Sequence, residues 1–170
     1  MVARNQIAVW NFFGKPLPAG SAAPEFEALD ESGRLVRLSS LRGHAVLLVF
    51  YPADGTPVCR AQLCEIRDSW SQFEAAGVRV FGVNPARADR HRRFSADNRF
   101  PFPLLVDQGQ RIAKLYRANG WLVKRTVVLI DAVGTIVFSQ RGAPSSESIL
   151  RALHPLPKHV SNAVEPPATV

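Results

Sequence analysis

The sequence lacks the features that mark several common classes of protein. Its 170 residues contain two cysteines, and no apolar run approaches the roughly 20 residues that a membrane-spanning helix needs. The N-terminus has no basic segment followed by an apolar stretch and a small-residue cleavage site, so we expect no secretory leader. We therefore expect a cytoplasmic protein without membrane contacts, in which two cysteines do not form a permanent structural disulfide.

The usual spacing of metal ligands is also missing. Cys59 and Cys64 are not spaced as C-x-x-C, no second ligand pair follows, and the four histidines are scattered. We expect no bound metal and no cofactor. The absence of C-x-x-C also argues against a thioredoxin-type reductase.

Positive charge is in excess, with a net charge of +7. One short segment contains His91 and five arginines: Arg87, Arg90, Arg92, Arg93 and Arg99. An anionic partner such as nucleic acid is one interpretation of such a cluster. No nucleic-acid motif or interleaved aromatic platform accompanies it, so we favour a solvated basic face and do not expect nucleic-acid binding.

Hydrophobic patterning predicts one α/β domain over about residues 20–154, with an N-terminal extension at 1–19 and an irregular tail at 155–170. Residues 25–38 are predicted to form a β-hairpin. Further strands are predicted at 45–51, 78–83, 104–106, 126–130 and 135–138, and helices at 57–77, 87–99, 110–116 and 145–153. This order predicts a mixed central sheet with helices on both faces, parallel first crossovers and an antiparallel late hairpin.

Both cysteines lie in one segment, Pro52-Ala-Asp-Gly-Thr-Pro-Val-Cys-Arg-Ala-Gln-Leu-Cys64, between a predicted strand and a predicted helix. Thr56-Pro57 is typical of a helix start, since Thr can cap free N–H groups and Pro has none to leave unpaired. Cys59 then lies in the first helical turn, where the helix dipole and free amides favour a thiolate.

The spacing of Cys59 and Cys64 does not suit a disulfide in an intact helix. Five residues rise about 7.5 Å along a helix and rotate by roughly 140°. Bridged cysteines usually need Cα atoms within about 6.8 Å. Either the two cysteines never pair, or the first helical turns unwind when they do. On spacing alone, both could also be small buried hydrophobic residues.

The pattern Pro52-x-x-x-Thr56-x-x-Cys59 after a strand resembles the active-site motif of the peroxiredoxins, an AhpC/TSA-like family. Further matches are Ala-Pro-Glu-Phe at 23–26, Leu-Ser-Ser-Leu-Arg-Gly at 38–43 and Arg-Thr-Val-Val-Leu-Ile-Asp at 125–131. A second cysteine five residues after the first is similar to the peroxiredoxin Q, or bacterioferritin comigratory protein, subgroup. The resemblance covers about residues 20–154. It implies a thioredoxin-like fold and reduction of hydrogen peroxide or organic hydroperoxides without metal or haem.

The resemblance also implies roles for five residues. Cys59 would be the peroxidatic cysteine and Cys64 the resolving one, while Arg125 would favour the thiolate and the charge developing on the peroxide oxygen. Thr56 would hydrogen-bond sulfur or peroxide, and Pro52 would shield Cys59 from water. A sulfenic acid would form first and then an intramolecular disulfide, which thioredoxin or a similar dithiol reductant would reduce.

Some positions depart from the subgroup pattern. Arg60 and Gln62 stand where a small hydroxyl residue and a glutamate are common, and Val128 replaces a frequent phenylalanine. A second hypothesis is a peroxide-sensing, redox-regulated binding protein with little turnover, in which the basic 87–99 segment contacts a partner. We expect a monomer or a weak homodimer. The sequence leaves the preferred hydroperoxide open.

Overall fold

A computed structural model describes residues 14–153, which are built around a five-stranded mixed sheet. The strands are β3 (Ala45–Phe50), β4 (Val78–Asn84), β5 (Leu104–Val106), β6 (Thr126–Ile130) and β7 (Ile136–Arg141). Their order across the sheet is β5-β4-β3-β6-β7. β4 runs parallel to β3 and β5, whereas β6 is antiparallel to β3 and β7. The predicted mixed sheet, with parallel first crossovers and an antiparallel late hairpin, is confirmed.

The predicted N-terminal hairpin is also present and forms a separate two-stranded sheet. Its strands are β1 (Glu27–Leu29) and β2 (Leu35–Arg37). The Asp30 carboxylate closes the turn by accepting hydrogen bonds from Ser32 N and Arg34 N, each 2.9 Å long. These contacts satisfy backbone groups that a short turn would otherwise leave unpaired.

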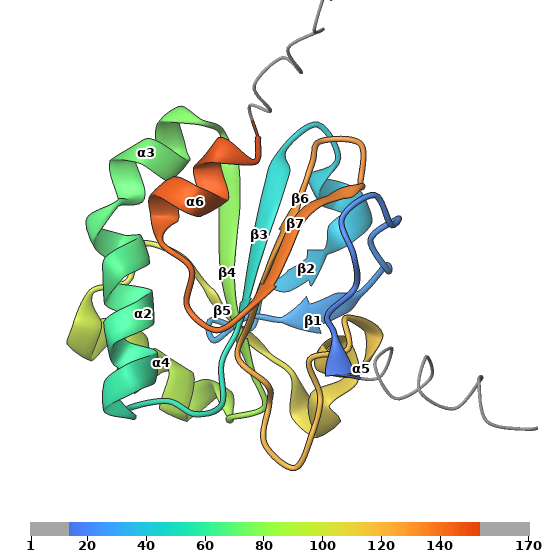
Figure 1. Ribbon diagram of the computed structural model, residues 1–170. Helices are drawn as coiled ribbons and strands as arrows, with labels where there is room; N and C mark the ends of the chain where they lie inside the picture. The colour runs from blue at the N-terminus through green and yellow to red at the C-terminus, as the bar shows by residue number, and fades with distance from the viewer. Residues whose placement is uncertain (1–13, 154–170) are drawn as a thin grey trace, which may run out of the picture.

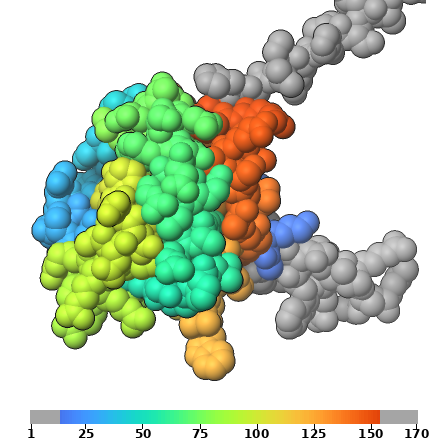
Figure 2. Space-filling view, turned by 90° about the vertical axis from the view of Figure 1, so that its left-hand side faces the viewer, coloured from blue at the N-terminus to red at the C-terminus, as the bar shows by residue number. Residues whose placement is uncertain are grey.

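Helices cover both faces of the central sheet (Figure 1). They are α2 (Pro57–Asp68), α3 (Trp70–Ala75), α4 (Ala88–Asn98), α5 (Arg111–Leu115) and α6 (Ser146–Arg151), with 3-10 segments η1 (Leu38–Leu41) and η2 (Gln108–Gln110). On one side lie α2, α3, α4 and α6, and on the other lie α5 and the β1–β2 hairpin. Viewed from the first side, α2 lies between α4 and α6 (Figure 2).

Side-chain alternation along β3 divides the apolar core into two parts. Val46, Leu48 and Phe50 pack with residues of the hairpin and α5. Leu47 and Val49 point the other way and pack with the buried face of α2. A strand buried on both faces explains why its sequence is apolar throughout rather than alternating.

Two predicted elements differ from the structure. The helix expected at 57–77 is two helices, because Ser69 has a non-helical φ of −94° and ψ of 10° between α2 and α3. Ser competes with helical hydrogen bonding and suits such a break. β7 extends to Arg141, beyond the predicted end at 138, because its pairing with β6 continues until Arg141 faces Thr126. The last residues of β7 are polar, so a prediction based on apolar runs ended the strand too early.

The described residues include only part of the chain over which domain boundaries were predicted. The proposed tail at 155–170 and most of the extension at 1–19 lie outside them, so both stay predictions. Within 14–153, no helix is long and apolar enough to cross a membrane.

Candidate active site

The cysteine segment joins β3 to α2 as predicted, but Thr56 does not cap the helix with its hydroxyl. Thr56 occupies the N-cap position with extended backbone angles, and Pro57 is the first helical residue. The first helical hydrogen bond runs from Arg60 N to Thr56 O at 2.9 Å. The Thr56 side chain is exposed and makes no capping hydrogen bond. The predicted side-chain cap is therefore wrong, while the predicted helix start is confirmed.

Cys59 lies in the first turn of α2 and is fully buried, with an exposed fraction of 0%. Its thiol is free. Leu63 and Ile66 follow on the same buried face, as the spacing predicted, and pack with Cys59 against the sheet. The sulfur therefore points toward the end of the sheet rather than into solvent.

Arg125 contacts the Cys59 sulfur although it lies 66 residues further along the chain. The antiparallel pairing of β3 and β6 places Thr126 opposite Phe50, so Arg125 lies beside the chain that leaves β3. Its Nη2 donates to Cys59 Sγ at 3.1 Å. A guanidinium at this distance favours negative charge on sulfur. Among the described residues, no other group donates a hydrogen bond to this sulfur.

Gln62 fixes the orientation of Arg125. Its Oε1 accepts from Arg125 Nη1 at 2.5 Å, and its Nε2 donates to Gly142 O at 3.5 Å. Gln62 is one turn after Cys59 on α2 and is 6% exposed. Because an amide carries no charge, it holds the guanidinium without neutralising it. In the sequence, Gln62 stood out only as a departure from the subgroup pattern; its place three residues after Cys59 was the available signal.

Cys64 lies on another face of the intact α2, away from Cys59. It is half-buried and free, and its Sγ is 3.8 Å from Asn98 Oδ1 on α4. Arg67, one turn further on, donates from Nη1 to Asn98 O at 2.7 Å. The structure therefore does not bring the two cysteines together, and their pairing stays a prediction.

Pro52 and Thr56 occupy the loop that precedes α2. Pro52 is half-buried and Thr56 is exposed. The shielding role of Pro52 and the peroxide-binding role of Thr56 stay predictions. Within 14–153, no three His, Cys, Asp or Glu side chains are grouped to hold a metal ion.

The sequence grouped His91 with five arginines on a solvated face, but in the structure its environment differs from theirs. The five arginines of that segment are exposed, whereas His91 is 0% exposed and lies 2.7 Å from the Asp54 carboxylate. The assignment of His91 to a solvated face is wrong. His91 and Phe94, three residues apart, form the buried side of α4, and this spacing was a readable signal.

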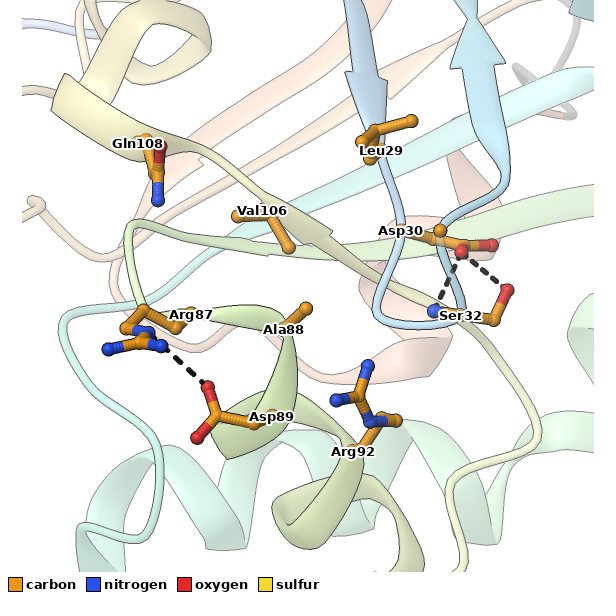
Figure 3. Close-up of a pocket in the computed structure, with 10 residues that line it drawn as sticks. Leu29, Asp30, Ser32, Arg87, Ala88, Asp89, Arg92, Val106 and Gln108 are labelled. Atoms are coloured by element: carbon orange, nitrogen blue, oxygen red, sulfur yellow. Dashed lines mark hydrogen bonds and ion pairs between the residues drawn. The ribbon is translucent and has the colours of Figure 1, made fainter.

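A surface pocket of about 580 Å³ lies between the hairpin turn and the start of α4, apart from the cysteines (Figure 3). Its charged side chains are paired locally. Arg87 lies 3.5 Å from Asp89, Asp30 accepts from the Ser32 hydroxyl, and Arg92 donates to a backbone carbonyl of the hairpin turn at 2.9 Å. The pocket contains none of the predicted site residues.

The AhpC/TSA family matches residues 19–139. The chain belongs to this family, the peroxiredoxins. Peroxiredoxin Q, chloroplastic, from Oryza sativa subsp. japonica is 38% identical over 123 residues, which are 70% of this chain and 57% of that protein. Peroxiredoxin Bcp from Bacillus subtilis is 30% identical over 148 residues, covering 81% of this chain and 93% of Bcp. This peroxiredoxin therefore spans little more than half of its rice relative.

Peroxidoxin BcpB from Mycobacterium tuberculosis has a similar solved structure. The two chains are 28% identical with a TM-score of 0.75, over 81% of this peroxiredoxin and 96% of BcpB. The predicted thioredoxin-like fold and the predicted family are both confirmed.

Proposed function

We propose that this peroxiredoxin is a thiol-dependent peroxidase that reduces hydrogen peroxide and organic hydroperoxides through Cys59. The observation that carries the proposal is the free, buried Cys59 thiol in the first turn of α2, with the Arg125 guanidinium 3.1 Å from its sulfur. A thiolate is the reactive form of cysteine, and both the helix start and the guanidinium favour it. The names of the relatives, peroxiredoxin Q and Bcp, agree with this chemistry.

In the first step, the Cys59 thiolate attacks one peroxide oxygen. A sulfur–oxygen bond forms and the O–O bond breaks, so sulfur is oxidised to a sulfenic acid and the peroxide is reduced. The leaving oxygen departs with the electron pair and takes up a proton, giving water or an alcohol. Arg125 stabilises the negative charge that moves from sulfur to the leaving oxygen.

In the second step, Cys64 condenses with the sulfenic acid, releasing water and forming a disulfide. Because both cysteines lie on an intact α2 with different orientations, the first turns of this helix must unwind for the sulfur atoms to meet. An external dithiol then restores both thiols by exchange. Thioredoxin or a similar protein is the proposed reductant.

Mass spectrometry after one equivalent of peroxide tests this route. Starting from the reduced protein, we expect its mass to fall by that of two hydrogen atoms. A non-reducing digest should contain a disulfide-linked pair of peptides that carry Cys59 and Cys64. Cys59→Ser should abolish peroxide turnover. Cys64→Ser should keep the first oxidation, lose recycling by thioredoxin and accumulate sulfenic or sulfinic acid. Turnover by Cys59→Ser, or unchanged recycling in Cys64→Ser, would contradict the corresponding role.

A peroxide-consumption assay with thioredoxin and its reductase separates this function from the alternative. A peroxidase sustains consumption over many turnovers, whereas a peroxide-sensing protein shows little. The cytoplasmic location and the monomeric or weakly dimeric state stay predictions.

A further inference from the structure

Four buried polar side chains form a hydrogen-bonded cluster beneath the loop that leads to Cys59. Tyr51, Asp54, Asn84 and His91 are 0%, 4%, 1% and 0% exposed. Tyr51 directly follows β3, Asp54 lies in the loop itself, Asn84 ends β4, and His91 lies in the first half of α4. The peroxidase route above uses none of them. We refer to these four residues as the buried polar cluster.

Hydrogen bonds satisfy both carboxylate oxygens of Asp54. Tyr51 Oη donates to Oδ1 at 2.8 Å, and His91 Nδ1 lies 2.7 Å from Oδ2. The second ring nitrogen of His91 lies 3.3 Å from Asn84 O. The Asn84 side chain in turn donates to Tyr51 O at 3.0 Å. A buried carboxylate without such partners would be costly, so the four groups depend on one another.

The buried polar cluster is adjacent to the reactive sulfur. Tyr51 and Cys59 belong to the same packed part of the core. Burial and then the charge of Asp54 raise the pKa of the Tyr51 hydroxyl well above its ordinary value, and the charge of Cys59 adds to this shift. Tyr51 therefore links the buried polar cluster to the part of the core that holds Cys59.

Little else holds the loop in place. Thr56 makes no capping hydrogen bond, and Gly55 has a φ of 80°, a conformation that glycine adopts without strain. Over residues 52–56, the side-chain hydrogen bonds that the described structure contains all involve Asp54: its carboxylate binds Tyr51 and His91, and its backbone carbonyl accepts from Arg90 Nη2 at 3.4 Å. The loop before α2 is therefore attached to the rest of the fold mainly through Asp54.

We propose that Asp54 and His91 are positioning residues for the peroxidase. Their contact fixes the chain at the start of α2, so that the first turn holds the Cys59 sulfur against Arg125 for attack on peroxide. This inference rests on the proposed function. Loosening the contact should slow the attack by Cys59 but should not slow disulfide formation, because that step requires the same turn to leave its place.

Single-turnover kinetics test the proposal in the full-length protein. The variants are Asp54→Asn and His91→Gln, each folded as judged by circular dichroism. Quenched-flow mass spectrometry with hydrogen peroxide gives separate rate constants for Cys59 oxidation and for Cys59–Cys64 disulfide formation. We expect oxidation to slow by about tenfold or more, since small misplacements of reacting groups have effects of this size. We expect disulfide formation to be at least as fast as in wild type, and thiolate ultraviolet absorbance at neutral pH to fall.

Matched controls use residues outside the loop. Asp30→Asn changes another aspartate that is 4% exposed, but one whose partners lie in the β1–β2 turn. His44→Gln changes an exposed histidine. Both should retain the two wild-type rate constants, whatever stability Asp30→Asn loses.

Three outcomes would overturn the inference. The first is oxidation of Cys59 at the wild-type rate in the folded Asp54→Asn and His91→Gln variants. The second is an equal slowing of Cys59 oxidation and disulfide formation in these variants. The third applies if those variants do not fold. Tyr51→Phe then replaces them, because it removes only one hydroxyl bond to Asp54. Cys59 oxidation at the wild-type rate in Tyr51→Phe would show that the cluster is structural alone. Absence of turnover in the wild-type protein would instead contradict the proposed function.

Discussion

At the residue scale, one guanidinium connects the Cys59 sulfur to the rest of the candidate site. Arg125 donates to Cys59 from Nη2 and to Gln62 from Nη1, so its planar group is oriented by two partners. Lysine has the same charge but lacks this fork. The contact depends on geometry as well as charge.

Arg125→Lys should therefore fold normally but react slowly with peroxide. We expect kcat/KM to fall by about 10²-fold to 10³-fold, the usual effect of removing one preorganised donor from a site of developing charge. Stopped-flow peroxide reduction measures it. Arg93→Lys, at an exposed position of α4, is the matched control and should equal wild type. A kcat/KM within about twofold of wild type would show that charge alone suffices.

At the scale of the element, the second half of α2 is bonded to two neighbouring helices. The Glu65 carboxylate accepts from Ser146 N at 3.0 Å and from Ser146 Oγ at 2.9 Å, at the start of α6. Arg67 contacts the end of α4. These contacts lie beyond Cys64, so the unwinding of the first turns that the proposed disulfide requires would not break them.

Glu65→Ala should destabilise the fold by removing both hydrogen bonds to Ser146. We expect the free energy of unfolding to fall by about 1–2 kcal/mol, as for other lost helix caps. Urea denaturation measures the change. Glu74→Ala, at an exposed position of α3, should change it by less than about 0.5 kcal/mol. Equal effects of the two substitutions would mean that the Glu65 contact contributes no net stability.

At the scale of the whole molecule, the two faces of the sheet are each closed by a buried tyrosine. Tyr51 lies on the α2 side, and Tyr116 lies on the hairpin side, where its hydroxyl donates to Pro24 O at 2.7 Å. Burial, and secondarily the charge of Glu25, raises the pKa of Tyr116 above its ordinary value. The folded state therefore disfavours the ionised phenol.

This shift predicts alkaline destabilisation. A tyrosine in the unfolded chain ionises near pH ~10, whereas the folded one stays protonated to higher pH. The unfolded state thus loses its proton first, and stability falls as the pH rises above about 10, by at most about 1.4 kcal/mol per pH unit for each phenol. Urea denaturation between about pH 9 and 11 should show this loss, with a shallower slope in Tyr116→Phe. Identical slopes would contradict the prediction.

Much of the fold and part of the site follow from the sequence because they depend on local order. Apolar runs predicted the central strands, and Thr56-Pro57 predicted where α2 starts. The position of Cys59 in the first helical turn followed from these two features. The different orientations of Cys59 and Cys64 on one helix followed from the geometry of the helix alone. These properties depend on residues within a few positions of one another, so the local sequence pattern predicts them.

The contacts that complete the site were decided by the tertiary structure. Arg125 meets Cys59 across 66 residues because the register of β3 and β6 brings them together, and His91 meets Asp54 across 37 residues through the packing of α4. Within the sequence, His91 was one basic residue among arginines, and Asp54 was a loop residue. Strand register and helix packing depend on the fit of whole faces, which local propensity does not encode. The sequence by itself therefore determined which cysteine is the candidate nucleophile, and the fold determined which groups surround it.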